Sequence, residues 1–361
     1  MAPGRRGGPP RPGRAPSGRI PLPRSPGPAR HAMTTLSVFY PEPPAPAEME
    51  RLRERLDPRV LLRTGPALPE PADFEVLVCG RPSEAQLDAS PRLRLLVIPW
   101  AGLPEGTRPL LLRRPAIAVC NLHHNAAATA ETAAALLLAA AKFLVPMDRA
   151  LRAGDWSPRY EASPSVILDG ARALLLGYGE VGRRVARICR GLGMEVRAVR
   201  RRPGAAGGVQ ADPAYPPEAL HGLLPSADAL LVTLPLTERT RGMIGEREIA
   251  LLPPRAVLVN VGRAAVVDER ALYEALRDGR LRAAGLDVWY RYPAAAAERT
   301  ATLPSAFPFH QLGNVVMSPH RGGHPGTEGV ERLRMDALAA ALNAAAACEP
   351  VPHPVDVAEG Y

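Results

Sequence analysis

The chain has 361 residues, with 45 lysines and arginines against 36 acidic residues, and 46% of it is hydrophobic. This composition excludes a chain that is disordered over most of its length, and the length predicts two domains that each bury a core. Residues 1–32 hold seven arginines and no acidic residue, so residues 33–361 carry only +2 of the formal +9 charge. A nearly neutral body argues against a broad phosphate-binding face, and we expect no nucleic-acid partner.

Residues 1–32 also contain nine prolines and six glycines, a composition that cannot form a packed core. Three interpretations compete: a disordered arm, a targeting peptide, or a wrongly assigned start whose true initiator is Met33. We favour the third, because Arg5-Arg6 is not followed by an apolar segment and the prolines would spoil an amphipathic transit helix.

The four cysteines, Cys79, Cys120, Cys189 and Cys348, lie far apart, with no CxxC pair and no histidine at metal-ligand spacing. We interpret them as structural thiols of a cytoplasmic protein and expect no metal site. The longest apolar run, 132–141, is far shorter than the roughly 20 residues of a membrane span, so no membrane association is expected.

Short apolar segments alternate with helical ones from Met33 onward. The pattern predicts a first series of strands, one long helix over 126–151 that ends near Gly154, a second series of strands, and a final helix over 328–346. The expected strands are 36–40, 60–62, 74–79, 93–98 and 117–120, then 173–176, 196–199, 229–232, 256–259, 284–287 and 315–317. Strands that alternate with helices predict an α/β fold with parallel, doubly wound sheets.

A glycine-rich sequence, Gly177-Tyr178-Gly179-Glu180-Val181-Gly182, follows the strand at 173–176 and opens a helical stretch over 183–192. GxGxxG alone is weak, but between a strand and a helix it predicts a dinucleotide site. The glycines permit the tight turn, the approach of backbone to the pyrophosphate, and close packing of the helix on its strand. A glycine-rich turn without a ligand is the alternative.

The end of the next strand predicts which ribose is bound. A site that prefers NAD usually carries Asp or Glu about 20 residues after the glycines, where this chain has Arg200, Arg201 and Arg202. Three guanidinium groups offer charge-assisted hydrogen bonds to a 2′-phosphate, so we expect NADP(H) to be favoured, with NAD(H) as the alternative. A solvated turn is the competing interpretation of these arginines.

Several further stretches carry a family resemblance: Thr129-Ala130-Glu131, Leu234-Pro235-Leu236-Thr237, Asn260-Val261-Gly262-Arg263, Leu286-Asp287-Val288 and Ser318-Pro319-His320. With the glycine loop, they make the chain similar to the D-isomer-specific 2-hydroxyacid dehydrogenases over almost all of residues 33–361. The resemblance implies two Rossmann-like and flavodoxin-like lobes, with the coenzyme domain inserted into a discontinuous substrate domain, and a homodimer. The domains it implies are 33–125 (substrate), 126–322 (NAD(P)-binding) and 323–361, a helix that returns to the substrate domain.

The resemblance also implies roles for single residues. Arg263 matches the arginine that holds the substrate carboxylate, His320 matches the acid–base histidine, and Asp287 matches the residue that orients the nicotinamide carboxamide. A structural histidine and a strand-end cap are the plain alternatives for His320 and Asp287. Further cofactor contacts are expected from Leu234, Pro235, Thr240, Val261 and Gly322.

The substrate side is expected to include Trp100, Ala101 and Gly102, in a loop whose backbone N–H groups hold the carboxylate in relatives, together with Asn125. His123 and His124 precede the long helix, and their role stays open. Aromatic residues around the same predicted cleft form either a wide apolar pocket or ordinary packing: Trp100, Trp289, Tyr290, Tyr292, Phe307 and Phe309.

One position departs from the family pattern. Relatives pair the histidine with a Glu five residues after the Asp of Leu-Asp-Val, and this chain has Tyr292 there, with Glu298 the next carboxylate. A phenol supplies no charge, so we expect a less basic His320 unless Glu298 reaches back. A milder departure is Ala264, where relatives commonly have Gly.

The leading hypothesis is an oxidoreductase that reduces a 2-oxo acid to a 2-hydroxy acid with NAD(P)H. The missing Glu motivates a second hypothesis, oxidation of a hydride donor in the manner of formate dehydrogenases. A third is a dinucleotide-binding regulatory protein with little turnover.

Overall fold

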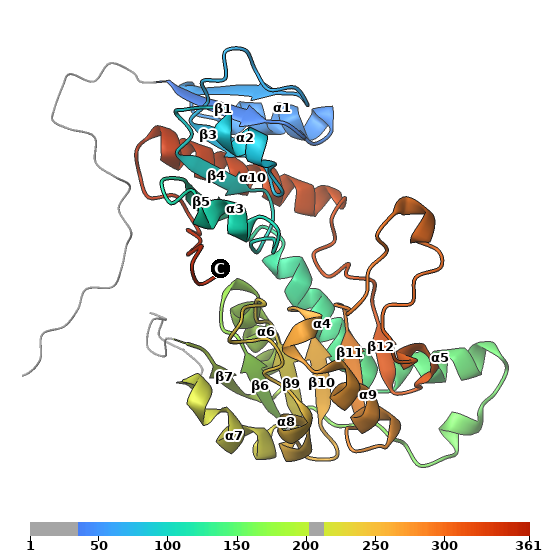
Figure 1. The fold of residues 1–361 in the computed structure, drawn as a ribbon. Coiled ribbons are helices and arrows are strands. Elements are labelled where there is room, and N and C mark those ends of the chain that lie inside the picture. Colours follow the sequence, from blue (N-terminus) through green and yellow to red (C-terminus); the bar gives the residue numbers. More distant parts are fainter. Residues whose placement is uncertain (1–34, 202–212) are drawn as a thin grey trace, which may run out of the picture.

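The chain folds into two lobes, seen one above the other in Figure 1. The computed structural model describes residues 35–201 and 213–361. The interpretations of residues 1–32, the start at Met33 and the role of Arg202 therefore fall outside the described residues.

The first lobe is built on a five-stranded parallel sheet in the order β2-β1-β3-β4-β5. Alternate residues of its strands point to opposite faces, so Val38 packs toward α1 and α10 while Phe39 packs toward α2 and α3. The strands are β1 (Leu36–Tyr40), β2 (Val60–Thr64), β3 (Val76–Val78), β4 (Leu95–Ile98) and β5 (Ala118–Asn121), and the helices are α1 (Pro46–Arg55), α2 (Glu84–Asp88), α3 (Arg108–Leu112) and α10 (Glu328–Ala346). Residues from the two ends of the chain thus share one core.

The second lobe is a seven-stranded parallel sheet in the order β12-β11-β10-β9-β6-β7-β8. Helices α4 and α6 cover one face, and α7, α8 and α9 cover the other. The strands are β6 (Arg172–Leu176), β7 (Glu195–Val199), β8 (Ala214–Tyr215), β9 (Ala229–Val232), β10 (Val257–Asn260), β11 (Ala283–Leu286) and β12 (Val315–Met317). The helices are α4 (Ala126–Ala141), α6 (Glu180–Gly191), α7 (Leu220–Leu223), α8 (Glu246–Leu251) and α9 (Glu269–Arg277). The predicted α/β class with parallel sheets is confirmed.

The single helix predicted over 126–151 is wrong. The structure has α4 and a separate helix α5 (Leu144–Arg152), bent by 65° with respect to each other. Pro146 explains the break, because proline lacks an N–H and its ring clashes with the carbonyl four residues earlier, at Lys142. The chain turns at Phe143, whose φ of 52° is left-handed.

Within residues 35–201 and 213–361, no single helix is long and apolar enough to cross a membrane, and only the bent pair α4 and α5 reaches the required length and composition together.

The loops at the carboxyl ends of the strands bring the two lobes together. The loop after β4 reaches Arg263 in the loop after β10, and Asn125, after β5, reaches Gly323 in the loop after β12. Ligands of open parallel sheets bind at this edge, so the candidate site lies between the lobes.

Candidate active site

The glycine-rich loop joins β6 to α6. Gly177 has a φ of 98°, in the left-handed region that favours glycine. A Cβ at Gly182 would collide with the carbonyl oxygen of Gly177, so the helix packs directly on the loop. Apart from its chain neighbours, no heavy atom of residues 35–201 and 213–361 lies within 4 Å of a Cβ placed on Gly179, at the start of α6. Open space in front of a helix N-terminus fits a pyrophosphate.

The other residues of the glycine-rich loop are either buried in the core or paired with arginines. Tyr178 is buried in the core between β6 and α4, and Val181 packs against the same core. Glu180 forms ion pairs with Arg183 and, at 2.5 Å, with Arg184. Burial raises the pKa of Glu180, but the hydrogen bond from Arg184 and the two positive charges outweigh it and lower that pKa overall. The two arginines thus offset a carboxylate beside the expected phosphates.

Two of the three arginines after β7 are described, and they differ in their partners. Nη1 of Arg200 is buried and meets no hydrogen-bond partner in the described part of the chain. Arg201 forms an ion pair with Glu359, and its guanidinium carbon lies 4.7 Å from the ring centroid of Tyr361. Sequence reasoning missed both partners, since 158 residues separate Arg201 from Glu359 and no local pattern links them.

The loops after β9 and β10 lie side by side next to the glycine loop. Thr240 donates from Oγ1 to the carbonyl oxygen of Pro235 (2.7 Å) and so braces the loop after β9. A Cβ at Gly262 would lie 2.6 Å from the carbonyl oxygen of Leu234, so the two backbones touch. Val261 is buried in the core beneath them.

Arg263 carries the next predicted role, and it lies against the substrate-side loop. Its Nη1 donates to the carbonyl oxygen of Gly262 (2.8 Å), and its Nη2 lies 2.9 Å from the position of a Cβ on Gly102. Burial lowers the pKa of Arg263, partly opposed by Tyr292 and Glu105. Within the described ranges the guanidinium has no ion-pair partner, a costly state for a half-buried cation that a bound carboxylate would relieve.

His320 and Tyr292 form a hydrogen-bonded pair. Oη of Tyr292 lies 2.8 Å from Nδ1 of His320 and accepts from the backbone N–H of Trp289 (3.1 Å). The hydroxyl can therefore donate to Nδ1 or accept from Nδ1–H, according to the tautomer and protonation state of His320. Glu298 does not reach the histidine, because its Oε2 accepts from the backbone N–H of Ala294 (2.9 Å).

The surroundings of His320 make it a weaker base. Desolvation by neighbouring protein atoms lowers its pKa, the charge of Arg263 lowers it further, and Asp287 only partly opposes them. The lowered pKa agrees with the sequence-based prediction that His320 is less basic. Burial raises the pKa of Tyr292, so the phenol stays protonated at neutral pH.

Asp287 holds the loop that carries His320. It is 1% exposed and accepts hydrogen bonds from Oγ of Ser318 (2.5 Å) and from the backbone N–H groups of Arg321 and Gly322 (both 2.9 Å). These bonds fix His320 at a φ of 56°, a left-handed conformation that costs energy in a non-glycine residue. The nicotinamide contact expected of Asp287 stays a prediction.

The predicted substrate-side residues are only partly brought to this centre. Gly102 lies against Arg263, and Nδ2 of Asn125 lies 2.5 Å from the position of a Cβ on Gly323. The ring of Trp100 instead packs on Gly80 within the first lobe, with Ala101 half-buried between Trp100 and Gly102.

Most of the aromatic residues are packing residues. Trp289 and Phe309 are buried in the core beside Tyr273, and Phe307 stacks on the Tyr273 ring at 5.3 Å. The hydroxyl of Tyr290 donates to the carbonyl oxygen of Val267 (2.9 Å). Tyr292 is the aromatic residue of this group that contacts His320. For Trp289, Tyr290, Phe307 and Phe309, the interpretation as ordinary packing is correct.

His123 and His124 lie at the lobe boundary. Burial lowers the pKa of each to about 4, and the ring of His123 lies against that of His353, tilted by 36° with centroids 4.5 Å apart. Among the described side chains, no group of three or more His, Cys, Asp or Glu is placed to hold a metal ion.

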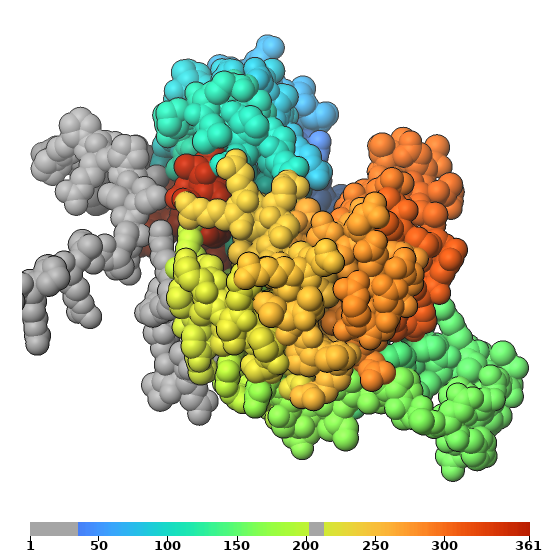
Figure 2. All heavy atoms as spheres, turned by 60° about the horizontal axis from the view of Figure 1, so that its bottom comes forward, coloured from blue at the N-terminus to red at the C-terminus, as the bar shows by residue number. Residues whose placement is uncertain are grey.

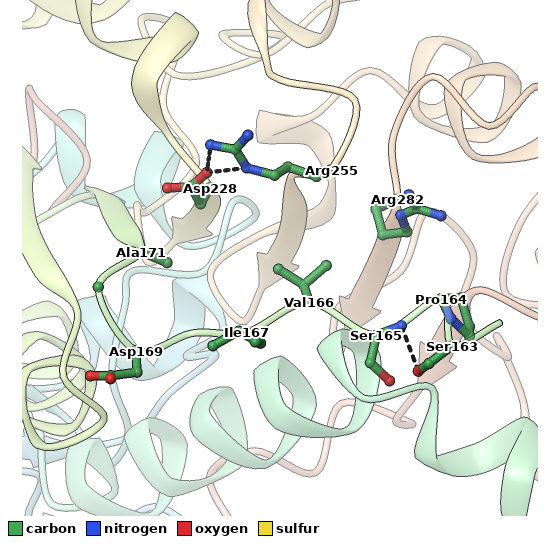
Figure 3. A pocket seen from close by; sticks show the side chains of 11 residues that line it. Ser163, Pro164, Ser165, Val166, Ile167, Asp169, Ala171, Asp228, Arg255 and Arg282 are labelled. Atoms are coloured by element: carbon green, nitrogen blue, oxygen red, sulfur yellow. Dashed lines mark hydrogen bonds and ion pairs between the residues drawn. The ribbon is translucent and has the colours of Figure 1, made fainter. Parts of the chain in front are cut away.

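A hollow on the second lobe lies away from these residues (Figure 3). It is lined by residues that precede strands, including Ala171 before β6, Asp228 before β9, Arg255 before β10 and Arg282 before β11. Asp228 and Arg255 form an ion pair there at 2.7 Å. Because it lies at the amino ends of the strands, this hollow is not the site formed by the glycine loop.

Comparison with protein families identifies the second lobe. The model of the D-isomer-specific 2-hydroxyacid dehydrogenase, NAD-binding domain, matches residues 134–322. Glyoxylate reductase from Thermococcus gammatolerans is 37% identical over 202 residues, which are 54% of this chain and 56% of that protein. The chain thus spans a little over half the length of the first curated relatives that it matches.

Solved structures match over both lobes. A D-isomer-specific 2-hydroxyacid dehydrogenase from Xanthobacter autotrophicus, in complex with NADPH, is 26% identical, with a TM-score of 0.73 over 91% of this chain and all of that chain. An NADPH-dependent glyoxylate/hydroxypyruvate reductase from Sinorhizobium meliloti is 25% identical, with a TM-score of 0.70 over 89% of this chain and 98% of that one.

Proposed function

The chain belongs to the D-isomer-specific 2-hydroxyacid dehydrogenase family, and from this premise we propose that it reduces a 2-oxo acid reversibly to a 2-hydroxy acid with NAD(P)H. The observation that carries the proposal is the half-buried guanidinium of Arg263, without an ion-pair partner in the described chain, close enough to His320 to lower its pKa. A carboxylate clamp beside an acid–base group is what a 2-oxo acid requires.

Arg263 binds the substrate carboxylate through its planar fork, and the missing Cβ of Gly102 lets the backbone of the substrate-side loop come close to Nη2. Protonated His320 gives its Nε2 proton to the oxygen of the substrate carbonyl, which leaves the neutral ring with its proton on Nδ1; in the reverse direction Nε2 of that neutral ring takes the proton back. The nicotinamide cofactor, when bound, supplies or accepts the hydride. Asn125 and Ala101 line the substrate side by this proposal.

Tyr292 acts on His320 in place of the family's Glu. Its hydroxyl can accept from Nδ1–H both in the protonated ring and in the neutral ring that has given up its Nε2 proton, so it orients the ring in both states. It brings no negative charge, and protonated His320 is correspondingly a stronger acid.

The residues present fit a dinucleotide with a 2′-phosphate. The open space at Gly179 suits the pyrophosphate, and the buried Nη1 of Arg200, which has no hydrogen-bond partner among the described residues, is available to donate to an anion. We therefore propose that NADP(H) is favoured over NAD(H), with Arg200 and Arg201 holding the phosphate. Leu234, Pro235, Thr240, Val261, Asp287 and Gly322 complete the proposed cofactor contacts.

The decisive measurement is loss of nicotinamide absorbance with NADPH and NADH, across glyoxylate, hydroxypyruvate, pyruvate and bulkier 2-oxo acids. His320→Asn keeps a residue that tolerates the left-handed backbone and is expected to lower kcat by about a hundredfold or more. Arg263→Gln is expected to raise KM and lower kcat. Protein that binds a cofactor yet reduces no acid would contradict the proposal, and formate oxidation would then be assayed next.

The proposed homodimer and cytoplasmic location rest on separate observations. Large apolar side chains are exposed along the arm at residues 144–167, which projects from the second lobe in Figures 1 and 2: Leu144 (59%), Leu151 (51%), Trp156 (60%), Tyr160 (79%) and Ile167 (75%). A second copy would bury them. All four cysteines are free thiols, which supports a reducing compartment.

Sedimentation velocity tests the dimer. Trp156→Asp, in the middle of the exposed apolar arm, is expected to shift the protein toward monomer, whereas Leu61→Asp, an equally exposed change on β2, is not. A monomeric wild-type protein at micromolar concentration would contradict the dimer.

A further inference from the structure

The C-terminal segment, residues 353–361, is anchored on the first lobe. It runs antiparallel along β5, where the N–H of Val355 donates to the carbonyl oxygen of Val119 (2.8 Å) and the N–H of Asn121 donates to that of His353 (3.2 Å). Arg108 on α3 then donates to the carbonyl oxygens of Val357 (3.1 Å) and Ala358 (2.6 Å). These bonds fix the path of the segment.

The end of the segment is a closed turn. The N–H of Gly360 donates to the carbonyl oxygen of Asp356 (2.8 Å), and the N–H of Glu359 donates to Oδ1 of the same residue (3.0 Å). The turn presents Glu359 and Tyr361 to Arg201 of the second lobe. Figures 1 and 2 show the segment, in red, between the two lobes.

The segment lies along the expected cofactor path. Arg201 follows β7, whose last residue, Val199, accepts a hydrogen bond from the N–H of Gly177 in the glycine loop (3.0 Å). At the other end of the segment, His353 lies near enough to Glu180, the first residue of α6, for the two side chains to interact electrostatically. By the proposed function, the segment extends from the expected place of the pyrophosphate to the expected place of the adenosine ribose.

We infer that Glu359 is a cofactor-selectivity residue that supplies, from the far end of the chain, the carboxylate missing after β7. This inference rests on the proposed function. In a site for NADH, a carboxylate at this position accepts from the ribose 2′-hydroxyl. In a site for NADPH, the same carboxylate occupies the guanidinium that would bind the 2′-phosphate and repels that phosphate.

The neighbouring groups set the balance between the two cofactors. Arg200 has a free buried donor for a phosphate, whereas Arg201 is shared with Glu359 and covered on one side by the Tyr361 ring. Arg239 lies 3.6 Å from the other oxygen of Glu359 and holds it weakly at the surface. Arg200 and Arg201 favour binding of the 2′-phosphate, and the carboxylate of Glu359 opposes it.

The test is isothermal titration of NADPH, NADH, 2′,5′-ADP and 5′-AMP against the whole chain and two variants. Glu359→Gln is expected to bind NADPH and 2′,5′-ADP roughly three- to tenfold more tightly and NADH more weakly. Glu349→Gln, an exposed glutamate just before the segment, is the matched control and should leave every affinity unchanged.

The outcomes separate this inference from the proposed function. An NADPH-to-NADH affinity ratio that is the same in Glu359→Gln and wild type, or that moves toward NADH, overturns the inference alone. A shifted ratio in a protein that reduces no 2-oxo acid supports the inference and overturns the reductase. Binding of neither dinucleotide by wild type and both variants overturns both.

Discussion

Arg263 and Arg201 illustrate how the surroundings of one residue type assign different tasks. Arg201 is paired with a carboxylate of its own chain, whereas Arg263 lies against Gly102 of the substrate-side loop and has no ion-pair partner in the described ranges. An unpaired, half-buried guanidinium is unfavourable unless an external anion completes it. The substrate carboxylate is therefore expected at Arg263, and competition between anions is expected at Arg201.

The depressed pKa of His320 predicts the pH dependence of reduction. Protonated His320 is the proton donor, so kcat/KM for reduction falls as pH rises through a pKa below the usual 6.5. Tyr292→Glu places a carboxylate at Nδ1 and favours the protonated ring, so the fall is expected about 1–2 pH units higher. Initial rates between pH 5 and 9 measure the shift.

Tyr292→Phe is the control for this change, because it removes the hydroxyl that contacts Nδ1 without adding a charge. Its pH profile should remain close to that of the wild type, while its kcat falls modestly as the ring loses its orientation. If Tyr292→Glu and Tyr292→Phe gave the same profile, the charge argument would be wrong.

At the scale of elements, apolar periodicity was sufficient to predict nearly all of the strands, since strands buried on both faces read as short apolar runs. The strand at Ala214–Tyr215 is too short to leave such a pattern, and one proline in an Ala- and Leu-rich run was enough to separate α4 from α5. Local motifs located Arg263, His320 and Tyr292. The contact of Glu359 with Arg201 has no local pattern, because only the path of the folded chain brings them together.

The turn from β6 into α6 gives a prediction from two glycines. Gly179→Ala places a methyl group in open space, so stability should be unchanged, but the methyl occupies the approach of the pyrophosphate and should weaken NADPH binding about tenfold or more. Gly182→Ala collides with the carbonyl oxygen of Gly177, so it should lower both cofactor affinity and the melting temperature.

Thermal melting without cofactor and titration with NADPH, done on both variants, separate the two effects. Gly191→Ala, near the end of the same helix, has nothing within 4 Å of its Cβ and serves as the control for an added methyl group. If the Gly179→Ala and Gly182→Ala variants lost equal amounts of melting temperature, the prediction that a methyl group at Gly179 meets no neighbouring atom would be wrong.

At the scale of the whole molecule, the two lobes are joined by more than the chain crossovers. Arg241 of the second lobe pairs with Glu105 of the first at 3.3 Å, and the C-terminal segment joins β5 to Arg201. The ring of His123, from the first lobe, lies against that of His353 at a tilt of 36°, and His123 is acted on by the charges of Glu180, Arg183 and Arg184 of α6. The boundary between the lobes thus contains half-buried histidines, His123 and His124, whose pKa values of about 4 keep them neutral at pH 7.

These histidines predict acid sensitivity of the fold. The folded pKa values of His123 and His124 are about 4, below the usual 6.5, chiefly because burial disfavours the charged ring. A depressed folded pKa contributes stability that is complete above about pH 6.5 and is lost as pH falls toward 4. Within that window, each histidine should lower the free energy of unfolding by up to about 1.4 kcal/mol for each pH unit of acidification.

Urea unfolding at pH 7, 6, 5 and 4.5 measures this slope. A His123→Gln/His124→Gln variant removes both titrations, so its free energy of unfolding should fall less steeply between pH 6.5 and 4, even if it is lower at pH 7. His310→Gln, at an exposed position, should keep the wild-type slope. Carboxylates that titrate in the same range are common to all three proteins, so a slope unchanged in the double variant would mean that both histidines are already protonated in the folded state.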